Sequence, residues 1–166
     1  KSVLVKTTVG IYQADSGQLH FEGRPVHIKG PKDAAALGIE VVYQDLALCD
    51  NLDIVQNMFL GREVTRRGLL DDGEMEQLAR TTLSGLNVHT VKSIRQSVSS
   101  LSGGQRQTVA IAKSVLWNSK VVVLDEPTAA LGVAQTAQVL ALTRRLAEQG
   151  LGVVLISHNM NDVFEV

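Results

Sequence analysis

Residues 101–128 read LSGGQRQTVAIAKSVLWNSKVVVLDEPT, and this stretch decides which fold class we predict. A loop of small residues opens into a helix predicted at 104–117, in which Val109, Ala112 and Leu116 recur on one face. Four apolar residues at 121–124 then predict a strand that is buried on both faces of a parallel sheet. A helix that leads into such a strand is the building unit of α/β proteins, so we predict this class.

Both ends of the stretch carry residue types that suit phosphate chemistry. Gly103 and Gly104 would let an anion approach bare N–H groups at a helix start, where the helix dipole favours negative charge. The acidic residues 125–126 follow the strand, and ligands of open α/β sheets gather beyond the carboxyl ends of strands. Each end also has a purely structural interpretation. Ser102 with Gln105 matches a capping box, and an acidic pair after a strand is often a solvated turn.

Taken together and in this order, the two ends resemble the ATPase subunit of ATP-binding cassette (ABC) transporters. LSGGQ at 101–105 is similar to the family signature, and VVVLDEP at 121–127 is similar to its Walker B strand. The resemblance implies a RecA-like P-loop NTPase core with a mostly parallel sheet, a small antiparallel β part and an inserted α-helical subdomain. It further implies a single domain over 1–166 that is truncated at both ends. The core would be 1–44 and 119–166, and the helical subdomain about 45–118.

Bulk composition is ordinary for a soluble globular domain and excludes several classes. The chain has 166 residues, of which 45% are hydrophobic and 20% charged, and its net charge is −1. This balance gives no electrostatic reason to expect a nucleic acid partner. The single Cys49 cannot form an internal disulfide, and no apolar run reaches the length of a membrane span.

The first residues are informative only beside the resemblance. Lys1 and Ser2 align with the last two positions of the P-loop pattern GxxxxGK[ST]. The resemblance then implies that Lys1 reaches the phosphates of ATP, that Ser2 ligates Mg²⁺ and that Val3 lies beside the nucleotide. The glycine loop that cradles phosphate would precede Lys1, so we expect a fragment that neither holds nor hydrolyses ATP normally.

The next stretch predicts a hairpin, a short helix and a strand. Strands at 19–22 and 26–28 flank a turn predicted at 23–25, a helix begins at 31–33 and ends near Gly38, and a strand covers 39–43. The strand leads directly into Gln44. By itself a glutamine there is more often a loop residue, but by resemblance it is the Q-loop residue that contacts Mg²⁺ and the attacking water. The loop 45–49 would then face membrane-spanning partners.

Between Gln44 and the signature the pattern is helical. Asp53 with Gln56 predicts a capping box, and a second helix begins at 71–72 with Met75, Leu78 and Ala79 on its core face. A small basic cluster in this region is predicted to be a solvated surface; it consists of Arg62, Arg66 and Arg67.

After the Walker B strand, the pattern predicts one more helix and one more strand. The helix buries Val139, Leu142 and Leu146 and stops at Gly150, and the strand at 153–156 delivers His158. A lone histidine is usually structural or solvated, but by resemblance His158 is the switch histidine that orients the γ-phosphate and the attacking water. Gly132 departs from the aspartate usual at the end of the loop 128–132, which puts in doubt one contact between paired cassettes.

The resemblance assigns roles in phosphoryl transfer to water, a reaction that depends on positioning and charge stabilisation. Asp125 would hold Mg²⁺ through a water, while Ser2 and Gln44 ligate it directly. Glu126, one residue further on, would be the general base. The predicted signature helix carries Ser102, Gly103, Gly104 and Gln105 away from this site, so these residues would close on ATP held by a second subunit in a homodimer.

Three functions remain open from the sequence. The favoured one is the ATPase subunit of a sugar importer of the ribose and xylose type. It would be peripheral on the cytoplasmic side of the inner membrane, bound to membrane-spanning permease subunits and served indirectly by a periplasmic or extracellular substrate-binding protein. A chromosome-maintenance or DNA-repair ATPase would need a long coiled coil before the signature, and 45–100 has no sustained heptads. A non-hydrolysing interaction module is the third possibility, suggested by Gly132 and by the missing P-loop glycines.

Overall fold

The computed structural model describes residues 1–88 and 90–166. A parallel sheet of three strands lies at its centre in the order β3-β6-β7, formed by Ile39–Val42, Val121–Asp125 and Gly152–Ile156. The central strand β6 is buried over residues 122–125, as its apolar run predicts, so the α/β prediction is confirmed.

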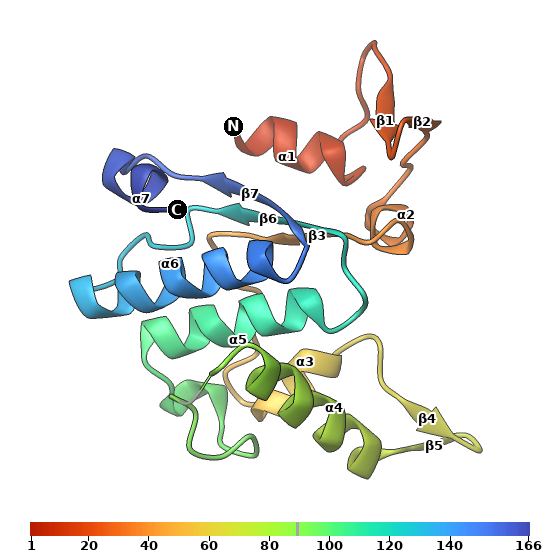
Figure 1. The fold of residues 1–166 in the computed structure, drawn as a ribbon. Helices are drawn as coiled ribbons and strands as arrows, with labels where there is room; N and C mark the ends of the chain where they lie inside the picture. The colour runs from red at the N-terminus through yellow and green to blue at the C-terminus, as the bar shows by residue number, and fades with distance from the viewer. Residues whose placement is uncertain (89) are drawn as a thin grey trace.

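Helices cover this sheet on both faces (Figure 1). The helices α5 (Gly103–Val115) and α6 (Val133–Glu148) pack side by side on one face, and α1 (Ser2–Thr8) lies over the other. The predicted core residues of α6 are confirmed, because Val139, Leu142 and Leu146 are all buried. The carboxyl ends of β6 and β7 and the N-termini of α5 and α6 therefore lie on the same side of the molecule.

A small antiparallel hairpin stands beside the sheet, but its turn differs from the prediction. Strands β1 (Leu19–Phe21) and β2 (Arg24–Val26) pair with Phe21 opposite Arg24, so the turn is Glu22 and Gly23. Both have positive φ, 51° and 75°, as a two-residue hairpin turn that follows the twist of its strands requires. The prediction of a turn at 23–25 was wrong because Pro25 was interpreted as a turn residue; it occupies an edge strand, where a missing N–H is tolerated.

The segment between β3 and β6 adds a helical layer below α5 (Figure 1). It contains α3 (Ile54–Phe59), the hairpin β4 (Thr65–Arg66) and β5 (Leu69–Leu70), and α4 (Asp72–Gly85). The predicted capping box of Asp53 is confirmed at the start of α3. The hairpin was not predicted, because strands of two residues leave no periodic pattern.

One side chain of this layer differs from the prediction. Leu78 is 38% exposed, whereas Met75, Ala79 and Leu83 form the buried stripe of α4. Arg62 is exposed, as predicted, and the structure adds two contacts that the sequence did not reveal: it donates to Glu40 at 2.8 Å and lies over the ring of Trp117.

Three short elements complete the description. They are α2 (Pro31–Ala36), the 3₁₀ turn η1 (Val98–Ser100) and α7 (Met160–Glu165). In the part of the chain that the structure covers, none of the helices is both long and apolar enough to cross a membrane.

Candidate functional site

The strand register gathers the candidate site at one edge of the sheet. Val42 pairs with Leu124 and Asp125 pairs with Ile156, so the three strands end level with one another. The residues that follow each strand then lie along this edge; they are Tyr43 and Gln44, Glu126, and Ser157 and His158. Sequence reasoning could place residues at strand ends, but it could not show which strands are neighbours.

Glu126 and His158 are in direct contact at this edge. The His158 Nδ1 and Glu126 Oε2 atoms lie 2.5 Å apart, and the His158 backbone N–H donates to the same oxygen at 3.3 Å. The Glu126 N–H donates to the Ile156 carbonyl at 2.8 Å, which ties the two strand ends together. The His158 ring is 75% exposed, whereas the Glu126 side chain is 17% exposed. The pair therefore presents its imidazole to solvent while its carboxylate is held by the sheet edge.

The backbone of Glu126 has an unusual conformation. Its φ is 53°, in the left-handed region, where a residue other than glycine costs roughly 1–2 kcal/mol. Strain of this kind persists only where the surrounding structure fixes it, and it concentrates at functional sites. Here the two hydrogen bonds to the segment 156–158 hold the residue in place.

Asp125 and Tyr43 form a second part of the edge. Asp125 is 9% exposed and belongs to the last pair of the sheet ladder. Burial raises the pKa of the Tyr43 phenol, and the negative charge of Asp125 raises it further. Tyr43 was not singled out from the sequence, because an aromatic residue at the end of a buried strand is usually a core residue.

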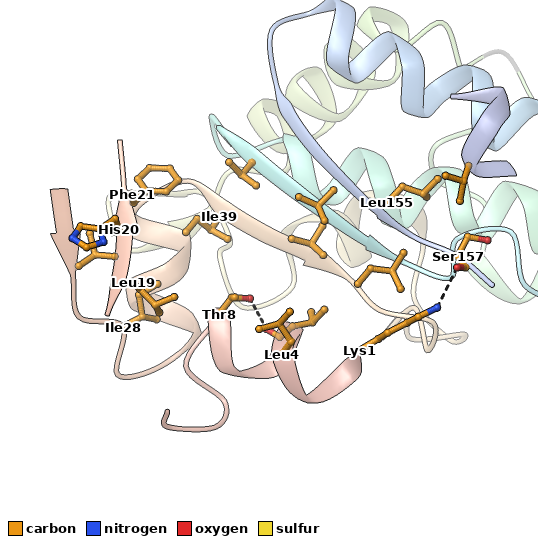
Figure 2. A pocket seen from close by; sticks show the side chains of 17 residues that line it. Lys1, Leu4, Thr8, Leu19, His20, Phe21, Ile28, Ile39, Leu155 and Ser157 are labelled. Atoms are coloured by element: carbon orange, nitrogen blue, oxygen red, sulfur yellow. Dashed lines mark hydrogen bonds between the residues drawn. The ribbon is translucent and has the colours of Figure 1, made fainter. Parts of the chain in front are cut away.

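Lys1 reaches the same edge from the other side of the sheet. Its Nζ donates to the Ser157 carbonyl at 3.2 Å (Figure 2), which places the start of α1 beside the end of β7. Ser2 and Val3 follow in the first turn of α1, and both are exposed. The structure thus brings Lys1 next to the segment that carries His158.

A cavity of about 500 Å³ lies beneath α1, between this helix, the hairpin and the sheet (Figure 2). Its lining is mainly apolar, with Leu4, Phe21 and Ile39 among the side chains, and β7 leaves Val154 48% exposed there. Polar groups reach it at Lys1 and Ser157. The cavity does not suit phosphate, and the polar edge outside it is the candidate functional site.

The signature residues lie apart from this edge. The capping box is confirmed, since Ser102 and Gln105 bond each other at the start of α5, and the Gln105 side chain also donates to the Thr90 carbonyl at 2.6 Å. Gly103 is exposed, but Gly104 is buried: a Cβ there would lie 3.0 Å from the side chain of Gln135 on α6. Close helix packing is therefore a second reason for glycine at 104, besides the anion approach that we predicted.

A network that the sequence did not reveal ties the signature to the loop after Gln44. Arg106 donates to the Asp50 carboxylate at 2.7 Å and to the carbonyls of Leu101 and Ser99. The backbone of Ser99 also donates to the Asp50 carbonyl at 3.1 Å. Since these contacts join residues that are up to 56 positions apart in the sequence, they hold the start of α5 and Asp50 together.

The donor types at the sheet edge fit a magnesium ion. Asp125 supplies a mostly buried carboxylate, for which the described contacts include no Lys or Arg partner. Ser2 and Gln44 supply a hydroxyl and an amide oxygen. The described residues contain no cluster of three or more His, Cys, Asp or Glu side chains that could enclose a metal. Mg²⁺ in proteins is commonly bound by one or two carboxylates together with waters and substrate phosphates.

Fold and edge together define an α/β protein of the P-loop NTPase class. A family model described as ABC transporter matches residues 1–129, and the chain belongs to this family. The structure also resembles a nucleotide-free ATP-binding cassette from an ABC transporter, with a TM-score of 0.84 at 22% identity over 98% of this chain and 68% of that one, which shows the shared fold.

Two curated relatives cover the whole of this chain. A fructose import ATP-binding protein of Rhizobium meliloti is 47% identical, and a xylose/arabinose import ATP-binding protein of Sulfolobus acidocaldarius is 45% identical. The chain spans 66% of the length of each relative. The resemblance noted from the sequence is thus confirmed at the level of the family.

Proposed function

We propose that this chain is the ATP-binding and ATP-hydrolysing part of an ABC transporter subunit that powers sugar import. One observation carries the proposal: the register of β3, β6 and β7 brings Gln44, Asp125 and the Glu126–His158 pair to a single edge. The two sugar-import relatives, whose sequences match this chain along its full length, support the substrate class.

Each residue of the edge has a role in this proposal. Lys1 binds the phosphates of ATP, with Ser2 and Val3 beside it, and Ser2, Gln44 and Asp125 hold Mg²⁺. The bound ion neutralises phosphate charge and orients the leaving group. Glu126 accepts the proton of the attacking water, and His158 keeps the Glu126 carboxylate oriented toward it.

The first test is Glu126→Gln, compared with wild type in a chain extended at both ends to the length of the relatives. General-base catalysis contributes about 10²–10⁴-fold, so we expect the turnover to fall by that factor while ATP still binds. Binding is measured with a fluorescent ATP analogue, and hydrolysis by phosphate release with and without Mg²⁺. Glu165→Gln is the control, because that side chain lies on the surface and bonds only Arg144 among the described residues. Unchanged turnover in Glu126→Gln would refute the assignment. The 166-residue chain, assayed in parallel, tests the expectation that it does not hydrolyse ATP.

A second copy of the subunit is the partner that the signature requires. Ser102 and Gly103 are exposed at the positive end of α5. Ser102 bonds Gln105 and Gly103 lies beside Leu131, so their described contacts do not lead to Lys1 or Asp125. We propose that Ser102, Gly103, Gly104 and Gln105 bind the ATP held by the partner copy.

Mixing two inactive variants tests this arrangement. In an equal mixture of Glu126→Gln and Ser102→Arg chains, half of the dimers are mixed, and each mixed dimer has one intact site of two. We therefore expect about a quarter of the wild-type activity to return if a symmetric dimer forms. A chain that carries both substitutions, mixed equally with wild type, is the control. Its mixed dimers have no intact site if sites are shared, so the purely wild-type dimers alone leave about a quarter of the activity, whereas independent sites would leave about half. No recovery in the first mixture would refute shared sites.

Permease subunits and a substrate-binding protein complete the proposed assembly, which places the chain on the cytoplasmic face of the membrane. The loop 45–49 is the proposed docking surface for the permease, since it follows Gln44 and the adjoining Asp50 is bonded to Arg106 of the signature helix. The test is ATP hydrolysis by the reconstituted assembly in vesicles, with fructose, xylose or ribose supplied with the binding protein. Stimulation by a sugar supports the proposal; equal hydrolysis with all sugars and with none contradicts the substrate class.

A further inference from the structure

Asp162 is a buried carboxylate without a described cationic partner. It lies on α7 and is 4% exposed, and its two oxygens accept hydrogen bonds from two neutral side chains. Oδ2 accepts from Thr128 Oγ1 at 2.5 Å, and Oδ1 accepts from Asn159 Nδ2 at 2.9 Å. A carboxylate is costly to bury, so these two bonds identify a group with a specific task.

The two donors belong to the segments that carry the Glu126–His158 pair. Thr128 lies two residues after Glu126, and Asn159 follows His158 directly. On the other side the segments are joined by the bonds from the Glu126 N–H to the Ile156 carbonyl and from the His158 N–H to Glu126. Asp162 therefore closes a ring of hydrogen bonds around the pair.

Helix capping alone does not account for Asp162. The cap of α7 is made by Asn159, whose side chain accepts from the Asn161 N–H at 3.1 Å. A capping role requires neither burial of Asp162 nor a contact with Thr128, 34 residues away in the sequence. The bond to Thr128 instead fixes the loop after β6 relative to the loop after β7.

We propose that Asp162 is a positioning residue for ATP hydrolysis: through Thr128 and Asn159 its carboxylate sets where Glu126 stands relative to His158. The expected effect of Asp162 on catalysis rests on the proposed function. Its expected effect on the geometry of the Glu126–His158 pair does not. Displacements of about 1 Å can lower a rate by about 10²-fold, so a side chain that does not touch substrate can control turnover.

Two substitutions test the catalytic part in the extended chain. Thr128→Val removes the donor while keeping the shape, and Asp162→Asn keeps the shape but replaces one acceptor oxygen by a donor. We expect kcat to fall roughly 10- to 100-fold with the KM for ATP within about twofold, and the double variant to be no slower than the slower single variant. Thr143→Val is the control for the same change of residue, because Thr143 is buried and, among the described residues, its side chain bonds only Val139 in its own helix. If Thr128→Val and Thr143→Val leave kcat equally unchanged, the proposal is overturned.

A measurement on the 166-residue chain separates this proposal from the proposed function. The ¹⁵N signals of the His158 ring, recorded at one fixed pH, report the hydrogen bond to Glu126. We expect Thr128→Val to shift these signals toward their values in Glu126→Gln, and Thr143→Val to leave them in place. Unmoved signals in Thr128→Val overturn the positioning role, even where kcat falls. If Thr128→Val moves the signals but the extended wild-type chain hydrolyses no ATP, the positioning of the pair is supported and the proposed function is refuted instead.

Discussion

Asn57 holds the loop that follows Gln44, and its replacement gives a prediction whose size can be worked out bond by bond. The side chain is fully buried in α3. Its Oδ1 accepts from the Cys49 N–H at 2.7 Å, and its Nδ2 lies within 3.3 Å of three carbonyl oxygens, those of Cys49, Leu52 and Asp53. Asn57→Leu keeps the approximate volume and removes all four bonds.

Most of the orphaned groups retain another partner. The Cys49 carbonyl still accepts from the Leu52 N–H, the Leu52 carbonyl from the Val98 N–H and the Asp53 carbonyl from the N–H of residue 57. Only the Cys49 N–H loses its single described partner. An unsatisfied buried group costs about 1–3 kcal/mol, and Cys49 is partly exposed, so we expect a loss of about 1–2 kcal/mol. At about 2–4 °C per kcal/mol for a chain of this size, the thermal midpoint falls by roughly 2–8 °C.

Urea denaturation of the 166-residue chain checks the estimate. Asn51→Leu is the control, since Asn51 is exposed in the same loop and should change stability by no more than about 0.5 kcal/mol. Asn57→Asp should be worse than Asn57→Leu, because a carboxylate would face three carbonyl oxygens without a proton to donate. A Leu variant as stable as wild type, or an Asp variant more stable than the Leu variant, would refute the hydrogen-bond assignment.

The structure predicts the effect of three further substitutions on stability. Gly104→Ala gains about 1 kcal/mol of helix propensity but crowds Gln135 at a cost of about 1–3 kcal/mol, so urea denaturation should show a net loss of up to about 2 kcal/mol. Hydrogen bonds from Arg80 lower the pKa of the Glu76 carboxyl. The ionised Glu76 therefore stabilises the fold above its usual pKa of 4.5, and this contribution is lost as the pH falls below that value. In Glu76→Gln the thermal midpoint should depend less steeply on pH in that acid range. Desolvation lowers the pKa of the Lys113 ammonium, so Lys113→Met should raise the thermal midpoint at neutral pH, and this advantage should shrink as the pH approaches 10.5.

Much of the fold follows from local patterns in the sequence. The run at 121–124 predicts β6 because only a strand buried on both faces is apolar throughout, and α6 is predicted by its 3.6-residue period. The hairpin turn was misplaced by one residue, because the preference of Pro25 for turns was given more weight than the positive φ available to Gly23. The side chain of Leu78 was misplaced because the period of a helix does not show which of two adjacent apolar rows, here Met75–Ala79–Leu83, packs on its neighbours.

Some residues of the candidate site could likewise be predicted from the sequence, and others could not. Asp125, Glu126 and His158 could be proposed from the sequence because each follows a predicted parallel strand, and the carboxyl ends of such strands share one edge. Tyr43, Asp162 and the Arg106–Asp50 pair could not, because their importance comes from partners far away in the sequence. The roles of the site residues remain predictions until the variants are measured.

The two faces of the signature differ in a way that bears on where its ligand comes from. On the inner face Gly104 is closed by Gln135, and there is no space for a phosphate between α5 and α6. On the outer face Ser102 and Gly103 are exposed at the positive end of a 13-residue helix, where an anion is stabilised. An anion can therefore reach these residues only from outside the chain, whereas Lys1 and Asp125 lie along the sheet edge of the chain itself. Under the proposed function, a nucleotide that contacts both sets would lie between two molecules, and for identical chains a two-fold arrangement that buries two nucleotides would be the closed solution.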